Sequence, residues 1–233
     1  MKLALLGYGK MGKVIERIAV ERGHEIIMKK SASDSFSGLE NADAAIEFSI
    51  PDAAVSNITQ CLNTGIPVVS GTTGWLEKYH DIAKLCEDKN GAFIYGSNFS
   101  LGVNIFFELN AHLAKMMGRL EQYKVSMEEV HHTQKLDAPS GTAITLAKDI
   151  IANTNYSSWA LGNPKEDEIL IDAKREENVP GTHTVTYNSE IDAIEIKHTA
   201  HSREGFALGA VIAAEWLAGK KGVYSMKDVL GLS

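Results

Sequence analysis

The sequence predicts an α/β protein of two domains, the first built on a parallel sheet and the second an α+β domain with a mixed or antiparallel sheet. Three observations support this prediction. Apolar strand-like runs alternate with helical patterns through the first hundred residues, which is typical of a parallel sheet with crossover helices. After Asn98 that alternation stops, and two late strands follow one another without a helix between them. The composition, with 44% hydrophobic and 23% charged residues, is that of an ordinary globular protein.

Each expected element rests on a short apolar run and its flanking residues. Pro51 favours the start of a helix, because its fixed φ angle and missing N–H suit the first helical turn. Before residue 100 the expected strands are residues 2–6, 25–30, 44–48, 67–70 and 92–95. The expected helices between them are residues 10–22, a segment opened by Pro51, and residues 75–90.

After residue 100 the pattern predicts a long amphipathic helix and then a strand of mixed polarity. A Pro-Ser-Gly-Thr turn next precedes an apolar helix, and two further strands lead to a last helix. The long helix is expected at residues 101–118 and the strand after it at residues 123–130. The two further strands are expected at residues 183–188 and 193–200, and the last helix at residues 206–218. We place the domain boundary near residue 100, because the alternation of strands and helices ends there. No repeat or low-complexity linker marks this boundary.

The formal net charge of -7 argues against a nucleic-acid or anionic-membrane partner, because the global field repels polyanions. The apolar run at the N-terminus is too short for a signal peptide, and no run reaches the roughly 18 apolar residues of a membrane helix. We therefore expect a cytoplasmic protein without a membrane partner.

Cys61 and Cys86 lie in expected helices without CxxC spacing, which favours buried thiols over a disulfide or a metal pair.

A glycine motif, Gly7-Tyr8-Gly9-Lys10-Met11-Gly12, lies between the first expected strand and the first expected helix. In this context GxGxxG allows a tight turn, close approach of a pyrophosphate and helix–sheet packing. It predicts a Rossmann-type dinucleotide-binding domain, the alternative being a merely tight turn between strand and helix.

The end of the second expected strand indicates which dinucleotide fits. Lys29, Lys30 and Ser31 stand where an NAD-preferring site usually has a carboxylate. Two ammonium groups and a hydroxyl suit a ribose phosphate, so we expect NADPH to be preferred, with NADH as the other cofactor. The alternative is a solvated strand end, and Lys30 and Ser31 are favoured over Lys29 as phosphate contacts.

Two loops follow the fourth and fifth expected strands, at the edge where open α/β sheets bind ligands. Small residues there let the backbone approach a nicotinamide ring, although as bare turns these loops would be unremarkable. The residues expected to line the cofactor are Gly71, Thr72, Thr73, Gly96, Ser97, Asn98 and Phe99.

The segment EEVHHTQKLDAPSGTA, residues 128–143, concentrates the most chemistry. Two imidazoles and an ammonium can supply protons and positive charge near neutral pH. These groups belong to His131, His132 and Lys135. The turn Ser140-Gly141-Thr142 opens a helix, where unpaired N–H groups meet the positive end of the macrodipole. Together they predict a pocket for a small anion that also receives a proton.

A metal site is not expected in this segment. Successive side chains on a strand alternate sides, so His131 and His132 point apart if the strand continues to them. Neither HExxH nor a Cys/His zinc spacing occurs. Asp137 is either an orienting partner of the lysine or a plain turn residue. No chemistry is assigned to the two acidic residues at the start of the segment, Glu128 and Glu129.

These motifs, in this order, resemble the dihydrodipicolinate reductases of lysine biosynthesis. The resemblance covers the glycine motif, GTTG, SNFSLGVN, EVHHTQKLDAPSGTA and the closing HTAHSREGFALGAVIAAEWLAGKKGVYSMKDVL. It implies reduction of a cyclic unsaturated dicarboxylate, formed by loss of water from hydroxy-tetrahydrodipicolinate, with hydride from NAD(P)H. The chain departs from the family in its lysine-rich strand end, in a shorter first glycine loop, and in Gly181-Thr182-His183 where Gly-Glu-His is common.

The resemblance also implies roles at matching positions. It implies that His131 is the acid/base group, that Lys135 is a proton donor and that His132 contacts the substrate. A substrate carboxylate is bound by Gly141 and Thr142, in the turn that Ser140 opens. The family pattern further implies a homotetramer and a C-terminal segment that returns to the nucleotide domain. The expected domains are residues 1–101 with 203–233, for the dinucleotide, and residues 102–202, for substrate binding and oligomerisation.

Two rival functions stay open. Another two-domain NAD(P)-dependent dehydrogenase, of the aspartate or homoserine dehydrogenase kind, would share the glycine motif without needing HHxxK before PSGT. A non-catalytic NADPH-binding sensor would keep the first domain and tolerate loss of the histidines.

Overall fold

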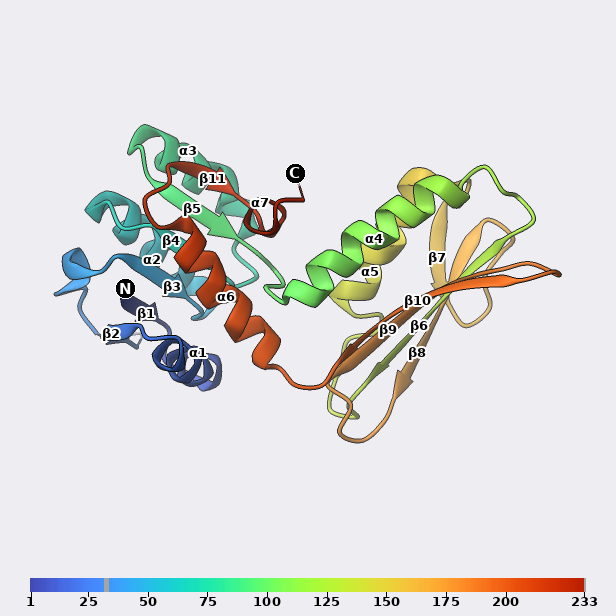
Figure 1. The fold of residues 1–233 in the computed structure, drawn as a ribbon, viewed down its shortest axis with the longest axis horizontal. Coiled ribbons are helices and arrows are strands. Elements are labelled where there is room, and N and C mark those ends of the chain that lie inside the picture. The colour runs from blue at the N-terminus through green and yellow to red at the C-terminus, as the bar shows by residue number, and fades with distance from the viewer. Residues whose placement is uncertain (32–33, 233) are drawn as a thin grey trace. The chain divides into compact units, whose positions relative to one another are not determined.

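The computed structural model describes residues 1–31 and 34–232. The chain divides into two compact units, one of Met1–Leu101 with Glu204–Ser233 and the other of Gly102–Arg203. Each unit has its own sheet (Figure 1). Apolar residues are buried against both faces of the first sheet and against one face of the second. Among the described helices, none combines the length and apolar character needed to cross a bilayer.

The first unit contains a six-stranded sheet in the order β11-β5-β4-β3-β1-β2, in which all neighbouring strands are parallel. Its strands are β1 (Lys2–Leu6), β2 (Glu25–Lys30), β3 (Ala44–Glu47), β4 (Val68–Ser70), β5 (Ala92–Tyr95) and β11 (Gly222–Tyr224). This confirms the parallel α/β sheet expected from the sequence. Because β1 leads to β2 on one side while β3 lies on its other side, the sheet has a topological switch point between β1 and β3, where such sheets bind ligands.

Helices cover both faces of this sheet (Figure 1). One face packs against α1 (Lys10–Glu21) and α6 (Glu204–Leu217), and the other against α2 (Pro51–Thr64) and α3 (Tyr79–Asp88). Burial on both faces explains why β1 is a continuous apolar run, with Leu3–Leu6 at most 1% exposed. The short elements are the 3-10 turns η1 (Leu39–Asn41) and η2 (Leu76–Lys78), and the helix α7 (Met226–Leu230).

Two details differ from the expected elements of the first unit. The single helix expected at residues 75–90 is a 3-10 turn followed by α3, which begins only at Tyr79. The two elements of the C-terminal tail, β11 and α7, were not expected from the sequence. Pro51 does open α2, and Gly65 ends it with a φ of 78°, a left-handed conformation that favours glycine.

The second unit contains a five-stranded sheet in the order β10-β9-β6-β8-β7. Its elements are α4 (Leu101–Met117), β6 (Lys124–His131), α5 (Gly141–Asn153), β7 (Ser158–Leu161), β8 (Glu168–Arg175), β9 (Gly181–Asn188) and β10 (Ala193–Ala200). The β6–β8 and β7–β8 pairs are parallel, and the β6–β9 and β9–β10 pairs are antiparallel. The sheet is therefore mixed. The helices α4 and α5 lie on one side of it (Figure 1) and bury part of their apolar residues against it, while Ile105, Leu109 and Met116 of α4 are exposed.

Candidate active site

The three glycines of the first motif have three different roles in the turn between β1 and α1. Gly7 has a φ of 103°, and a Cβ there would lie 2.0 Å from the carbonyl oxygen of Phe48. A Cβ on Gly12 would lie 2.3 Å from the carbonyl oxygen of Gly7, so α1 packs directly on the turn. A Cβ on Gly9, the N-cap residue of α1, would meet no atom within 4 Å. That open space at a helix N-terminus fits a pyrophosphate.

A cavity of about 300 Å³ adjoins this turn at the switch point between β1 and β3. Its walls come from the glycine turn, the end of β2, the loop after β3 and the start of α2. The predicted residues that line it are Gly7, Tyr8, Gly9, Lys30 and Ser31. Two other residues of the motif lie elsewhere, since Lys10 is exposed at the start of α1 and Met11 packs partly buried against the core.

The two lysines at the end of β2 have different surroundings. Lys29 places its Nζ 2.6 Å from a carboxylate oxygen of Glu16 and 5.1 Å from the ring centre of Tyr8, and the hydrogen bond with Glu16 raises the pKa of Lys29. Lys30 is only 6% exposed. Its Nζ donates to the Ser31 carbonyl oxygen at 3.0 Å and lies 4.7 Å from the ring centre of Phe36. Lys30 is therefore the lysine that lines the cavity, while Lys29 is committed to a carboxylate.

A buried carboxylate that the sequence reasoning missed organises the first cofactor loop. Glu47, at the end of β3, is 0% exposed. Its oxygens accept hydrogen bonds from Ser70 Oγ at 2.7 Å, Thr72 Oγ1 at 3.0 Å and the Ser49 amide at 3.1 Å. Thr72 is thus held in a structural network, and Thr73 is exposed. Glu47 fixes the loops after β3 and β4 relative to each other.

Close packing shapes the remaining residues of the two loops. A Cβ on Gly71 would lie 2.2 Å from the ring of Phe48. Phe99 is 1% exposed, and its ring centre lies 5.7 Å from that of Phe48. Its side chain is therefore core, and only its backbone could face a ligand. Gly96 and Asn98 are half-buried, while Ser97 is exposed.

In the second unit, the predicted anion turn lies at the start of α5. Ser140 is the N-cap residue, and its Oγ accepts a hydrogen bond from the Ala143 amide at 3.2 Å. The Oγ also lies 3.0 Å from Nε2 of His183, so the serine side chain is fully engaged. A Cβ on Gly141 would meet no atom within 4 Å. The amides of Gly141 and Thr142 thus stand in the first helical turn, where N–H groups have no intrahelical partner.

The segment between β6 and α5 carries Lys135 and is fastened by an arginine of β8. Lys135 Nζ lies 2.8 and 2.7 Å from the carboxylate oxygens of Asp137, and this hydrogen bonding lowers the pKa of Asp137. Arg175 donates from Nη2 to the Asp137 carbonyl oxygen at 2.7 Å and from Nε to the Lys135 carbonyl oxygen at 3.3 Å. Both termini of its guanidinium lie 3.3 Å from Glu129 Oε1.

The two adjacent histidines have different environments. His131 ends β6 and is 7% exposed, and its ring meets that of His183 edge to face at 5.0 Å. Burial lowers the pKa of His131, against the raising effect of Glu129, while Lys135, Arg175 and His132 lower it further. Burial and the nearby His131 lower the pKa of His183 to about 4.

His132 lies outside this buried group. Its Nε2 is 2.7 Å from Nη2 of Arg203, and both side chains line a cavity of about 460 Å³ together with residues 177–180. The imidazole and the guanidinium offer hydrogen-bond donors to an anionic ligand, whereas Glu177 in the same wall adds a negative charge. The segment therefore presents one buried histidine and one that faces a cavity.

Glu129, His131 and His183 also satisfy the spacing of a metal site. Each offers one ligand atom, and the three atoms lie within 4.8 Å of one another. In the sequence only His131 and His132 are adjacent, so this group, which strand pairing brings together, was not anticipated. The carboxylate of Glu129 already accepts the Ser140 amide at 2.9 Å and pairs with Arg175. Because this carboxylate is already engaged by other groups, we interpret the three residues as a buried electrostatic cluster, in which the two imidazoles lie 3.8 and 3.7 Å from Glu129.

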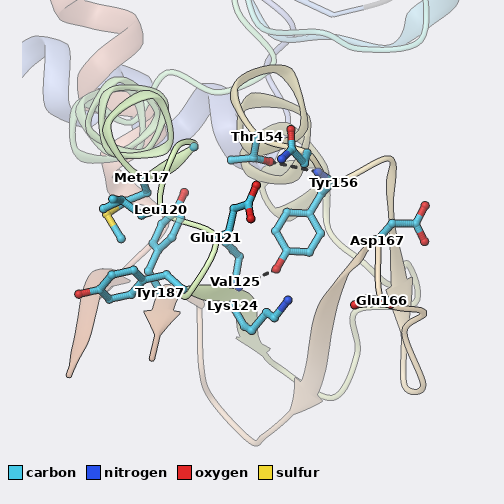
Figure 2. A pocket seen from close by; sticks show the side chains of 13 residues that line it. Met117, Leu120, Glu121, Lys124, Val125, Thr154, Tyr156, Glu166, Asp167 and Tyr187 are labelled. Atoms are coloured by element: carbon cyan, nitrogen blue, oxygen red, sulfur yellow. Dashed lines mark hydrogen bonds between the residues drawn. The ribbon is translucent and has the colours of Figure 1, made fainter. Parts of the chain in front are cut away.

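Another cavity of the second unit, of about 470 Å³, contains none of the predicted site residues (Figure 2). It lies among the end of α4, the start of β6 and the turn after α5, where Tyr156 accepts a hydrogen bond from the Val125 amide at 3.0 Å. Lys124 and Val125 begin the strand that His131 ends, so this cavity is at the other end of β6.

Glu129, Arg175 and His183 are the residues that the sequence reasoning missed in the second unit. One signal was present for Glu129. Along β6, Val125, Met127, Glu129 and His131 are all buried, and alternation places them on one face. Glu129 therefore shares its face with His131, whereas Glu128 pairs with Lys174 at the surface. For Arg175 and His183 the signal is the pairing of β6 with β8 and β9, which the sequence alone does not give.

Comparison with known protein families gives two matches that together span nearly the whole chain. Residues 1–99 match the model of the dihydrodipicolinate reductase N-terminus, and residues 102–230 match that of the dihydrodipicolinate reductase C-terminus. A 4-hydroxy-tetrahydrodipicolinate reductase of Christiangramia forsetii is 59% identical over 233 residues, covering 99% of this chain and 98% of the relative. One from Methanocaldococcus jannaschii is 38% identical over 82% of this chain and 72% of its own.

A solved structure supports the fold. The dipicolinate-bound dihydrodipicolinate reductase from Paenisporosarcina sp. TG-14 matches with a TM-score of 0.77 over 97% of each chain, at 22% identity. At that identity the likeness concerns the fold, and it confirms the combination of a parallel Rossmann-type sheet with a second mixed sheet. The family matches confirm the resemblance drawn from the sequence motifs.

Proposed function

Because this chain belongs to the dihydrodipicolinate reductase family, we propose which of its residues carry out the family's reaction. The function expected from the sequence is confirmed: the chain is an NAD(P)H-dependent oxidoreductase that forms tetrahydrodipicolinate in lysine biosynthesis through diaminopimelate. The observation that carries this function is the 59% identity over nearly the full chain. It also decides against the two rivals, another two-domain dehydrogenase and a non-catalytic sensor.

The substrate is a cyclic dicarboxylate, and the start of α5 is the proposed binder of one carboxylate. The Gly141 and Thr142 amides, opened toward solvent after the Ser140 cap, provide donors and the positive end of a helix dipole. Lys135 is the proposed cation beside it, which exchanges its pairing with Asp137 for the substrate carboxylate. His132 contributes a contact from the cavity wall that it shares with Arg203. These groups neutralise the substrate and hold its ring in one orientation, which is a large part of catalysis.

Proton transfer is assigned to His131, with Lys135 as a second donor. The nicotinamide supplies the hydride when bound. Reduction of the conjugated imine leaves an enamine-like anion on the substrate, which must be protonated at the neighbouring carbon. The lowered pKa keeps the His131 imidazole neutral at neutral pH in the free protein, and an adjacent dianionic ligand favours its protonated form. His131 thus gains a proton in the state in which one is needed.

A direct assay tests this function. Purified protein is mixed with enzymatically generated substrate, and nicotinamide absorbance is followed with NADPH and with NADH. We expect oxidation of the cofactor that depends on the substrate. Cofactor oxidation at the same rate without substrate, or none with it, would contradict the assignment.

The cofactor preference is a separate proposal, supported by the cavity at the end of β2. Lys30 and Ser31 line that cavity beside the glycine turn, where an adenosine ribose lies in Rossmann-type domains. Lys30→Ala should weaken NADPH binding by about 1 to 3 kcal/mol, the range of a charge-assisted hydrogen bond, and leave NADH nearly unchanged. Calorimetric Kd values for both cofactors measure this difference.

The matched control is Lys2→Ala, an equal loss of charge at the exposed beginning of β1. It should leave both Kd values as in the wild type. Equal weakening of NADPH and NADH by Lys30→Ala, or no weakening of either, would return Lys30 to a structural role at the strand end.

We also propose a cytoplasmic homotetramer assembled through the second units. Support comes from the mixed sheet, because α4 and α5 both pack on one of its faces, and β10 is mostly exposed in the described chain. Light scattering of the purified protein measures the mass, and a monomer at micromolar concentration would contradict the tetramer.

A further inference from the structure

An ion pair next to His131, between a buried carboxylate and a half-buried arginine, has no role in the function described so far. Glu129 is 0% exposed, and its Oε1 pairs with Arg175 at 3.3 Å. Removing a carboxylate from water is costly, and a buried pair is weak evidence for stability. The contacts of this particular pair suggest a different benefit.

The pair fastens both ends of the segment that carries the proposed chemistry. Glu129 Oε2 accepts the amide of Ser140, the N-cap of α5, at 2.9 Å. Arg175 holds the carbonyl oxygens of Lys135 and Asp137 at 3.3 and 2.7 Å. One bond therefore fixes the anion turn, and two fix the backbone beside Lys135.

The same carboxylate lies close to His131, the proposed donor of the proton. Glu129 Oε2 lies 3.8 Å from Nδ1 of His131, an atom without a hydrogen-bond partner among the described residues. The other charged or titratable groups around His131 come from the adjoining segment, from β8 and from β9. They are His132, Lys135, Arg175 and His183. Glu129 is the negative charge in this set, so it favours the protonated imidazole, while the positive groups oppose it.

We propose that Glu129 and Arg175 are positioning residues, in which Glu129 stabilises the proton on His131 and Arg175 holds the backbone of the Lys135 segment in its binding geometry. The proposal rests on the acid/base role of His131. It predicts that the two residues affect different measurements. Replacing Glu129 should change the pH dependence of kcat/KM, and replacing Arg175 should change the affinity for a dicarboxylate.

The first measurement is the pH profile of kcat/KM, which reports essential groups of the free enzyme. The limb that belongs to His131 is the one that His131→Gln removes. Glu129→Gln keeps the shape of the side chain and removes its charge. It should move that limb to lower pH by at least about one unit, as expected for loss of an opposite charge at this distance. Glu128→Gln, the same change at the adjacent surface residue, should leave the limb in place.

The second measurement is the Kd of dipicolinate. Arg175→Lys keeps the charge and loses the fork that reaches two carbonyl oxygens at once. We expect about tenfold weaker dipicolinate binding, the loss of roughly one or two hydrogen bonds, with the His131 limb unmoved. Should Glu129→Gln not fold, Glu129→Asp replaces it: this variant keeps the charge but draws it back from His131 Nδ1, so it should move the limb in the same direction by a smaller amount, and an unmoved limb overturns the role of Glu129.

The outcomes separate this inference from the function on which it rests. A limb that disappears in His131→Gln but coincides with the wild type in Glu129→Gln overturns the role of Glu129. Unchanged dipicolinate affinity in Arg175→Lys overturns the role of Arg175. Wild-type turnover in His131→Gln would instead contradict the proposed role of His131 itself.

Discussion

His131→Gln should lower kcat at least tenfold while leaving NADPH affinity nearly intact. General acid catalysis typically contributes about 10² to 10⁴ in rate, and glutamine cannot exchange a proton near neutral pH. The glycine motif and its cavity belong to the first unit, so the change does not alter the cofactor contacts. Steady-state kinetics and a fluorescence titration with NADPH measure the two quantities.

The control is His112→Gln, because His112 is an exposed histidine of α4. It should keep the wild-type kcat. A thermal unfolding curve like that of the wild type shows that His131→Gln is folded. Wild-type turnover in a folded His131→Gln protein would exclude His131 as the acid/base group.

Lys135→Ala should also lower kcat at least tenfold, since it removes the second proton donor.

Local patterns predicted much of the fold. The glycine motif needed only the adjacent strand and helix to be interpreted, and the structure gives its glycines the expected turn, open space and packing contact. The turn that begins with Ser140 was recognisable because an N-cap serine before an apolar run is a local signal. In both cases the physics acts over a few neighbouring residues, so the sequence contains it.

The buried group around His131 could not be predicted in the same way. Arg175 reaches Glu129 because β8 pairs with β6 in parallel, with His131 opposite Arg175. His183 arrives from β9, where it pairs with Glu129. The strand β8 was not expected at all. These contacts depend on strand register over more than 40 residues of chain, which hydrophobic periodicity does not specify.

The charges at the end of β2 illustrate a further limit. Lys29 and Lys30 are adjacent and identical in type, so the sequence could only rank them. Alternation along the strand and the position of Glu16 on α1 separate them, because Glu16 takes up Lys29. A neighbouring helix thus holds Lys29, whereas Lys30 is the lysine that lines the cavity.

Gly141→Val should abolish binding of dipicolinate while NADPH binding stays normal. A Cβ at this position meets no protein atom within 4 Å, so the space next to Gly141 is open to a larger side chain. The methyl groups of valine occupy the space in front of the first amides of α5, where we place a substrate carboxylate. Calorimetry with dipicolinate and with NADPH measures both affinities on the same preparation.

Ala152→Val is the matched control, because it adds the same two methyl groups at an exposed position near the other end of α5. It should bind dipicolinate as the wild type does. In the wild type, the corresponding pyridine monocarboxylate should bind at least about tenfold more weakly than dipicolinate, since it lacks one charge-assisted contact worth roughly 1.5 to 3 kcal/mol. Equal affinities for the two compounds would show that the second carboxylate has no partner in this protein. Normal dipicolinate binding by Gly141→Val would place the carboxylate site away from the start of α5. It would also contradict the roles given to Gly141 and Thr142.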